Sequence, residues 1–118
     1  MIALLDYGMG NLRSVEKALQ QAGAVVRVVQ DAAGVRGARA VVLPGVGAFG
    51  DCLANLRRAG LTEAIGEVVR SGRPFLGICL GFQALFESSA EAPGVAGLGL
   101  FAGTVPRFAN GKLNVPHM

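Results

Sequence analysis

Residues 75–83 read Phe75-Leu76-Gly77-Ile78-Cys79-Leu80-Gly81-Phe82-Gln83. The apolar run before Cys79 is typical of a strand buried in a parallel sheet, and we expect a helix over residues 80–87. Glycines two residues before and two residues after the cysteine leave room for a sharp strand-to-helix turn, as in the G-x-S-x-G nucleophile elbow. The pattern predicts Cys79 as a nucleophile whose thiolate is favoured by the helix N-terminus and by a neighbouring imidazole. The alternative is a buried cysteine flanked by packing glycines.

The rest of the chain alternates between short apolar runs and segments of helical periodicity. We expect strands at residues 2–5, 25–29, 40–43, 75–78 and 100–108, helices at 12–22, 51–58 and 61–70, a helical turn at 31–36, and a loop at 88–99. Asn11 is the expected cap of the first helix. The alternation predicts an α/β fold, with a doubly wound, mostly parallel sheet and helices on both of its faces.

Glycine accounts for 18 of the 118 residues, which is roughly twice its usual share of about 7%. The glycines cluster after the strands at 2–5, 40–43 and 75–78. Ligands of parallel sheets bind at the carboxyl ends of the strands, so we expect the three clusters to converge on one crevice; ordinary tight turns are the alternative. The loop Pro44-Gly45-Val46-Gly47-Ala48-Phe49-Gly50 can present bare N–H groups and, with the N–H of Leu80, form an oxyanion hole.

Three further features carry weaker predictions. The stretch Asp6-Tyr7-Gly8-Met9-Gly10-Asn11 suggests a dinucleotide fingerprint, with Asp31 as its acidic residue, but Arg13 stands where the third glycine belongs. Cys52 falls within the helix expected at 51–58 and is predicted to be a core residue. His117 is the only histidine and hence the only imidazole for the nucleophile, although a place beside the last residue is more typical of a loop residue.

Composition excludes several classes of protein. Hydrophobic residues make up 52% of the sequence and charged residues 16%, so the chain can bury a core. The net charge of +3 is scattered, and the aromatic residues do not alternate with basic ones, which argues against nucleic-acid binding. No apolar run approaches the roughly 18 to 20 residues of a membrane span, and no basic leader precedes the first strand, so we expect no membrane association and a cytoplasmic protein. Two cysteines and one histidine make neither a disulfide scaffold nor a zinc cluster. We expect no metal and no cofactor.

The motif around Cys79 resembles the nucleophile motif of the class I, triad-type glutamine amidotransferases. Four other motifs extend the resemblance over residues 2–118: Asp6-Tyr7-Gly8-Met9-Gly10-Asn11, Pro44-Gly45-Val46-Gly47-Ala48-Phe49, Glu91-Ala92-Pro93-Gly94 and Pro116-His117-Met118. Within that family, the motifs together are similar to those of the amidotransferase subunits of imidazole glycerol phosphate synthases.

The resemblance implies a flavodoxin-like fold and hydrolysis of L-glutamine to glutamate and ammonia. The ammonia would pass to a (β/α)8-barrel cyclase subunit, the partner in a heterodimer, which makes imidazole glycerol phosphate in histidine biosynthesis. The resemblance also implies a role for each site residue: Cys79 as the nucleophile, Gly47 and Leu80 at the oxyanion hole, and Gln83 and Glu91 against the substrate glutamine.

The sequence departs from the family pattern at the triad. The family completes its triad with a His-x-Glu pair that this sequence does not contain. We therefore expect residues 1–118 to form a single amidotransferase domain that is incomplete on its C-terminal side and inactive alone.

Two alternatives stay open. One is the amidotransferase component of another pathway, such as anthranilate or aminodeoxychorismate synthesis, although the motifs at residues 7–11 and 44–49 argue against it. The other is a flavodoxin-like binding module without catalysis, which the missing His-x-Glu pair favours.

Overall fold

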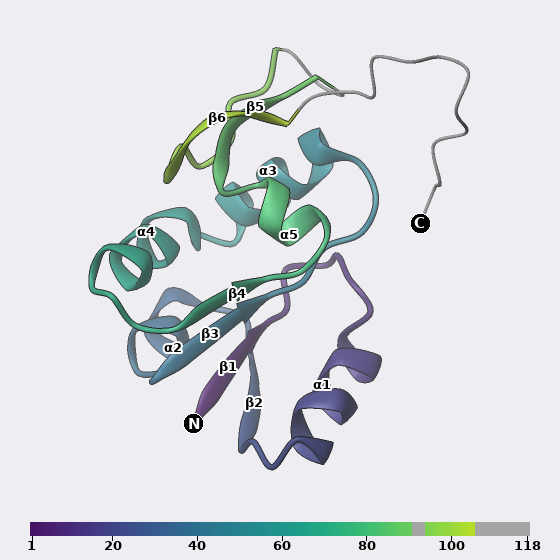
Figure 1. Ribbon diagram of the computed structural model, residues 1–118, viewed down its shortest axis with the longest axis vertical. Helices are drawn as coiled ribbons and strands as arrows, with labels where there is room; N and C mark the ends of the chain where they lie inside the picture. The colour runs from purple at the N-terminus through teal and green to yellow at the C-terminus, as the bar shows by residue number, and fades with distance from the viewer. Residues whose placement is uncertain (91–93, 106–118) are drawn as a thin grey trace.

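The structure is a computed structural model and describes residues 1–90 and 94–105. Its elements in chain order are β1 (Ile2–Leu5), α1 (Leu12–Gln21), β2 (Val26–Val29), α2 (Ala32–Arg36), β3 (Ala40–Leu43), α3 (Phe49–Arg58), α4 (Thr62–Arg70), β4 (Phe75–Gly77), α5 (Leu80–Gln83), β5 (Phe86–Ser89) and β6 (Phe101–Val105). Strands β2, β1, β3 and β4 form, in that order, a parallel sheet, and β5 pairs with β6 (Figure 1). The predicted doubly wound, parallel α/β fold is confirmed.

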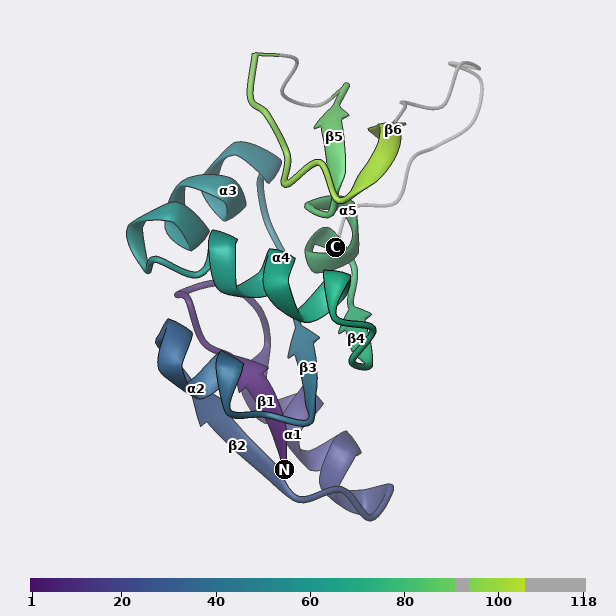
Figure 2. The ribbon, with the colours of Figure 1, turned by 90° about the vertical axis from the view of Figure 1, so that its left-hand side faces the viewer.

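One face of the sheet carries the core. Because side chains alternate along a strand and the strands pair in register, Ala3, Val41 and Phe75 lie on the same face, as do Leu5 and Leu43. Helices α2, α3 and α4 cover this face (Figure 2). Their wholly buried apolar side chains pack against it: Val35, Phe49, Cys52, Leu53, Leu56, Ala64, Ile65 and Val68.

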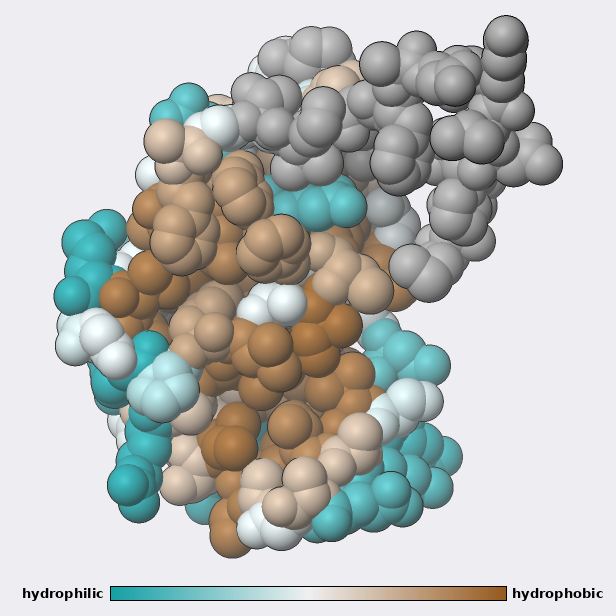
Figure 3. Space-filling view, in the orientation of Figure 1, coloured by the Kyte–Doolittle hydropathy of each residue, from teal (hydrophilic) through white to brown (hydrophobic). Residues whose placement is uncertain are grey.

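The other face has thinner cover. Helix α1 lies on it, behind the sheet in Figure 2, and has no fully buried residue. Leu4 and Val42 are buried there, but their register partners Val28 and Leu76 are 40% and 51% exposed. Figure 3 shows apolar side chains gathered over the strands on the side nearest the viewer. Helices therefore lie on both faces, as predicted, but they cover the two faces unequally.

The helix predicted at residues 80–87 is wrong beyond its first turn. Helix α5 ends at Gln83, and the chain continues as β5. The amides of Leu98 and Leu100 donate to the carbonyls of Ala84 and Leu85, at 2.8 Å each. The residues that follow Leu85 then pair with β6 instead of continuing the helix. The ring of Phe86 also packs between those of Phe82 and Phe101, with centroids 5.2 and 6.0 Å away.

The bounds of β5, β6 and α3 agree with the predictions only in part. Residues 88–89 belong to β5 rather than to a loop, and β6 lies within the strand predicted at 100–108, of which 106–108 fall outside the described residues. Asn11 is the N-cap residue of α1, as predicted, but its side chain makes no capping hydrogen bond there. Helix α3 begins at Phe49, two residues before the predicted start, because the wholly buried Phe49 is anchored in the core.

Candidate active site

In a sheet of this strand order, the crevice is expected at the carboxyl ends of β1 and β3. The chain runs from β1 outward to β2 and then returns to β3 on the opposite side of β1, so the loops after β1 and β3 diverge at a topological switch point. A Cβ built on Gly10 would lie 3.1 Å from Cβ of Pro44, and one built on Gly45 would lie 2.8 Å from the nitrogen of Gly81. The three glycine clusters therefore converge at one edge of the sheet, as predicted.

The dinucleotide interpretation loses its acidic residue. Asp31 caps α2, where its carboxylate accepts a hydrogen bond from the Gly34 amide at 2.9 Å. Asp6 is engaged locally as well, since it accepts from the side chain of Gln30 at 3.0 Å and from the Gly8 amide at 3.3 Å. Both carboxylates therefore already accept hydrogen bonds from within the protein.

The nucleophile elbow has the geometry that its glycines predict. Cys79 adopts φ 53° and ψ −119°, and within residues 1–90 and 94–105 no other non-glycine residue has a positive φ. A Cβ on Gly77 would lie 2.7 Å from Cα of Phe82, and one on Gly81 would overlap the carbonyl oxygen of Leu43. The thiol of Cys79 is exposed. The alternative of a buried packing cysteine is therefore wrong.

The surroundings of the Cys79 thiol differ from the prediction in one respect. Helix α5 is a single turn, so its N-terminus contributes a weaker field than the longer helix expected from the sequence. The amides of Phe82 and Gln83 already donate to the Cys79 carbonyl, at 3.0 and 3.2 Å. The candidate imidazole, His117, lies outside the described residues. The part of the chain that the structure describes therefore contains no imidazole for the thiol.

One of the predicted oxyanion donors, Leu80, is bonded to the loop that carries the other, Gly47. The amide of Leu80 donates to the carbonyl of Gly45 at 3.1 Å, which joins the elbow directly to the loop after β3. Gly47, two residues further along that loop, is exposed and has φ +103°. The Leu80 amide is thus bonded to a protein carbonyl in this conformation, and its part in an oxyanion hole stays a prediction.

Of the two residues expected to bind glutamine, only Gln83 lies within the described residues. Gln83 closes α5, one helical turn after Cys79, and its side chain is partly buried. Glu91 lies outside the described residues. The structure therefore places one of the pair near the elbow and says nothing about the other.

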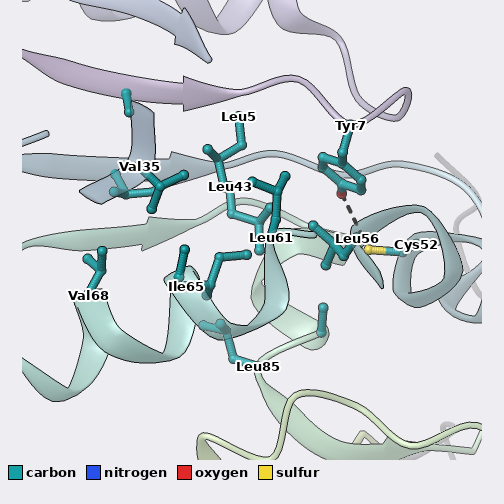
Figure 4. Packing of buried hydrophobic residues seen from close by; sticks show 14 of the residues in the cluster. Leu5, Tyr7, Val35, Leu43, Cys52, Leu56, Leu61, Ile65, Val68 and Leu85 are labelled. Carbon is teal, nitrogen blue, oxygen red and sulfur yellow. Dashed lines mark hydrogen bonds between the residues drawn. The ribbon is translucent and has the colours of Figure 1, made fainter. Parts of the chain in front are cut away.

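The sequence patterns missed a buried link beneath the loop. The hydroxyl of Tyr7 donates to the carbonyl of Pro44 at 2.6 Å and lies 3.3 Å from Sγ of Cys52 (Figure 4). Cys52 is wholly buried, as predicted, and Tyr7 is 6% exposed. Burial raises the pKa of the Tyr7 hydroxyl and that of the Cys52 thiol, so both groups stay protonated. The available signal was that the sequence's single tyrosine follows a buried strand, where its hydroxyl needs a partner.

The described residues contain neither a membrane-spanning helix nor a cluster of metal-binding side chains. None of the helices there is both long and apolar enough to cross a bilayer. Over the same residues, no three histidine, cysteine or acidic side chains lie close enough together to hold a metal ion.

Known proteins resemble this chain in sequence and in fold. The subunit HisH of imidazole glycerol phosphate synthase from Moorella thermoacetica is 54% identical over 117 residues, which cover 99% of this chain and 55% of that protein. Its counterpart from Rhodopirellula baltica is 46% identical over 119 residues, with 100% and 58% covered. The chain thus spans a little over half the length of these relatives. A crystal structure of a glutamine amidotransferase matches the fold with a TM-score of 0.77 at 23% identity, over 93% of this chain and 58% of that one.

A protein-family model also matches this chain. The model described as "Glutamine amidotransferase class-I" matches residues 3–115, nearly the whole sequence. The match includes the elbow at Cys79, the loop after β3 and the loop after β1, the three segments that meet at the crevice. This chain belongs to the class I glutamine amidotransferase family.

Proposed function

We propose that Cys79 is the nucleophile of a glutaminase that releases ammonia from L-glutamine. The observation that carries the proposal is the exposed thiol of Cys79 on a positive-φ elbow, in a chain of the class I amidotransferase family. Such a turn costs about 1 kcal/mol or more in a non-glycine residue, and strain of this kind is concentrated at functional sites. The neighbouring glycines remove every side chain that would stand against the turn.

The reaction would proceed through a thioester. The Cys79 thiolate attacks the side-chain amide carbon of glutamine, and backbone N–H groups stabilise the tetrahedral oxyanion. Protonation by an imidazolium lets ammonia leave, and water then hydrolyses the thioester to give glutamate. We assign the imidazole to the His-x-Glu pair of the family pattern. The proposal therefore concerns a protein of the length of its relatives, and residues 1–118 alone would be inactive.

The oxyanion hole would form from Leu80 and the loop around Gly47. The Leu80 amide is bonded to the carbonyl of Gly45, so that carbonyl has to turn away before the amide can reach an oxyanion. The positive φ of Gly47 gives the loop a conformation that few other residues adopt. Gln83 and Glu91 would hold the substrate's remaining polar groups.

The names of the relatives support a specific pathway and partner. Both are subunits of imidazole glycerol phosphate synthase, so we propose that the ammonia is used by a (β/α)8-barrel cyclase subunit in histidine biosynthesis, in the cytoplasm. The loops at residues 7–11 and 44–49 would face that subunit. An amidotransferase for anthranilate or aminodeoxychorismate synthesis is the alternative pathway.

The proposal is tested by trapping the nucleophile. The full-length protein is incubated with a glutamine-like electrophile, and the adduct is located by peptide mass spectrometry. Cys79 should be labelled stoichiometrically while Cys52, which is wholly buried, stays unlabelled and serves as an internal control. Cys79→Ala should abolish glutamine hydrolysis but leave complex formation and ammonia-dependent synthesis by the partner intact. Retained glutaminase activity in this variant, or an inert thiol in the wild type, would favour the binding module instead.

A further inference from the structure

Tyr7, Cys52 and Pro44 form a directed chain of hydrogen bonds under the crevice. The tyrosine hydroxyl has one proton, and the 2.6 Å distance to the Pro44 carbonyl, which can only accept, shows where that proton is donated. The thiol of Cys52, at 3.3 Å, is then the donor to the tyrosine oxygen. Both groups keep their protons at ordinary pH because burial raises the pKa of each. The chain therefore runs in one direction, from Cys52 in α3 through Tyr7 to the backbone of the loop after β3. Figure 4 shows its first step, between Cys52 and Tyr7.

The segment held by Tyr7 is the one that touches the elbow. A Cβ built on Gly45 would lie 2.7 Å from the Tyr7 hydroxyl, 2.8 Å from the Gly81 nitrogen and 3.1 Å from Cβ of Leu80. The Tyr7 hydroxyl and the elbow therefore both border the space where a side chain of Gly45 would stand.

The planarity of the peptide bond makes this contact an orienting one. The carbonyl of Pro44 and the amide of Gly45 belong to the same rigid plane, so fixing the carbonyl fixes the plane. The next peptide, whose carbonyl accepts from Leu80, can still rotate about the backbone of Gly45. The hydroxyl of Tyr7 therefore marks the boundary between the fixed and the movable part of the loop.

We propose that Tyr7 is a positioning residue for the oxyanion hole, with Cys52 supporting its hydroxyl from behind. This inference rests on the proposed glutaminase function. The hydroxyl holds the Pro44–Gly45 peptide still while the Gly45 carbonyl turns away from Leu80, so that the freed amide and the Gly47 loop reach one fixed arrangement. Without the hydroxyl, the loop samples more orientations, and a smaller fraction of them stabilises the oxyanion.

The test is Tyr7→Phe in the full-length protein with its partner bound. We expect kcat for glutamine to fall about tenfold, the effect of one hydrogen bond that matters mainly in the transition state, with little change in KM. Amide hydrogen exchange in the peptide that contains Leu80 should become faster, because the Gly45 carbonyl that protects this amide is held less firmly. The same variant should still react with iodoacetamide at Cys79, since the elbow does not depend on the hydroxyl.

Ser71→Ala is the matched control. The Ser71 hydroxyl also donates to a backbone carbonyl at 2.6 Å, that of Val68, but at the end of α4 and not in the crevice. Ser71→Ala should lower the melting temperature without changing kcat or the rate of amide hydrogen exchange at Leu80. A difference between the two variants in kcat therefore measures positioning and not stability.

The possible outcomes separate the inference from the function on which it rests. An active wild type with an equally active Tyr7→Phe variant and unchanged Leu80 exchange overturns the positioning role alone. A wild type without glutaminase activity overturns both. If Tyr7→Phe fails to fold, Cys52→Ala decides the question: a lower kcat at unchanged KM supports the inference, and an unchanged kcat overturns it.

Discussion

The elbow at Cys79 and the outer part of the loop after β3, at Gly47, both depend on glycine, but for different reasons. In the elbow, a Cβ on Gly77 or Gly81 would run into backbone atoms of Phe82 or Leu43. In the loop, a Cβ on Gly47 would meet only the flexible tip of Met9, at 3.1 Å, and the special feature is the φ of +103°. The elbow needs glycine for space, and the outer loop needs it for conformation.

The contrast separates the rigid half of the crevice from the movable half. Backbone carbonyls hold amides of the elbow: Gly81 donates to Ile78 at 3.0 Å, and Ile78 to Leu43 at 2.9 Å. Gly47 and its neighbour Val46 are exposed. The Leu80 amide spans the two halves, since its own position is fixed while its acceptor belongs to the loop. Substitutions in the rigid half should therefore affect folding, and those in the movable half should affect turnover.

The largest effect is expected for Gly81→Ala. The added methyl group would overlap the Leu43 carbonyl oxygen, and no side chain can move aside to make room. Separating β3 from the elbow should cost at least about 3 kcal/mol of unfolding free energy, the upper range for overpacking, and should remove glutaminase activity. Urea unfolding and a glutaminase assay measure the two losses.

Gly66→Ala is the control for that variant. The added methyl group would meet the guanidinium of Arg70 at 2.9 Å, which is the far end of a flexible side chain. Because alanine is the better helix former, this change inside α4 should be neutral or stabilising by up to about 1 kcal/mol. Equal stabilities for the two variants would show that the elbow is not the rigid half.

A smaller effect on stability but a large one on turnover is expected for Gly47→Val. A β-branched residue cannot keep the positive φ, so the loop must adopt another conformation and loses its proposed oxyanion donor. We expect kcat to fall about 10²-fold, in line with the loss of one such donor, while KM changes less. Steady-state kinetics and a thermal melt on the same sample test this. An unchanged kcat would make the loop a mere turn.

The elements that could be predicted from the sequence are those set by local patterns. The β-branched and apolar runs gave four strands of the sheet to within a residue, and the glycine spacing around Cys79 located the elbow. The failures depend on contacts between distant residues. Residues 86–89 form a strand because β6, at Phe101–Val105, pairs with them. The link from Tyr7 to Pro44 joins residues 37 positions apart, so no local pattern reveals it.

The smallest effect is expected for Gly23→Ala, which isolates conformation from space. Gly23 follows α1 with φ +93°, and a Cβ there would meet nothing within 4 Å. It therefore shares the positive φ of Gly47 but lies at the opposite end of α1 from the crevice. The strain of a left-handed alanine should lower the unfolding free energy by about 1 kcal/mol and leave kcat unchanged. If Gly23→Ala lowered kcat as far as Gly47→Val does, the loss at Gly47 would reflect general destabilisation, and the loop after β3 would have no special part in turnover.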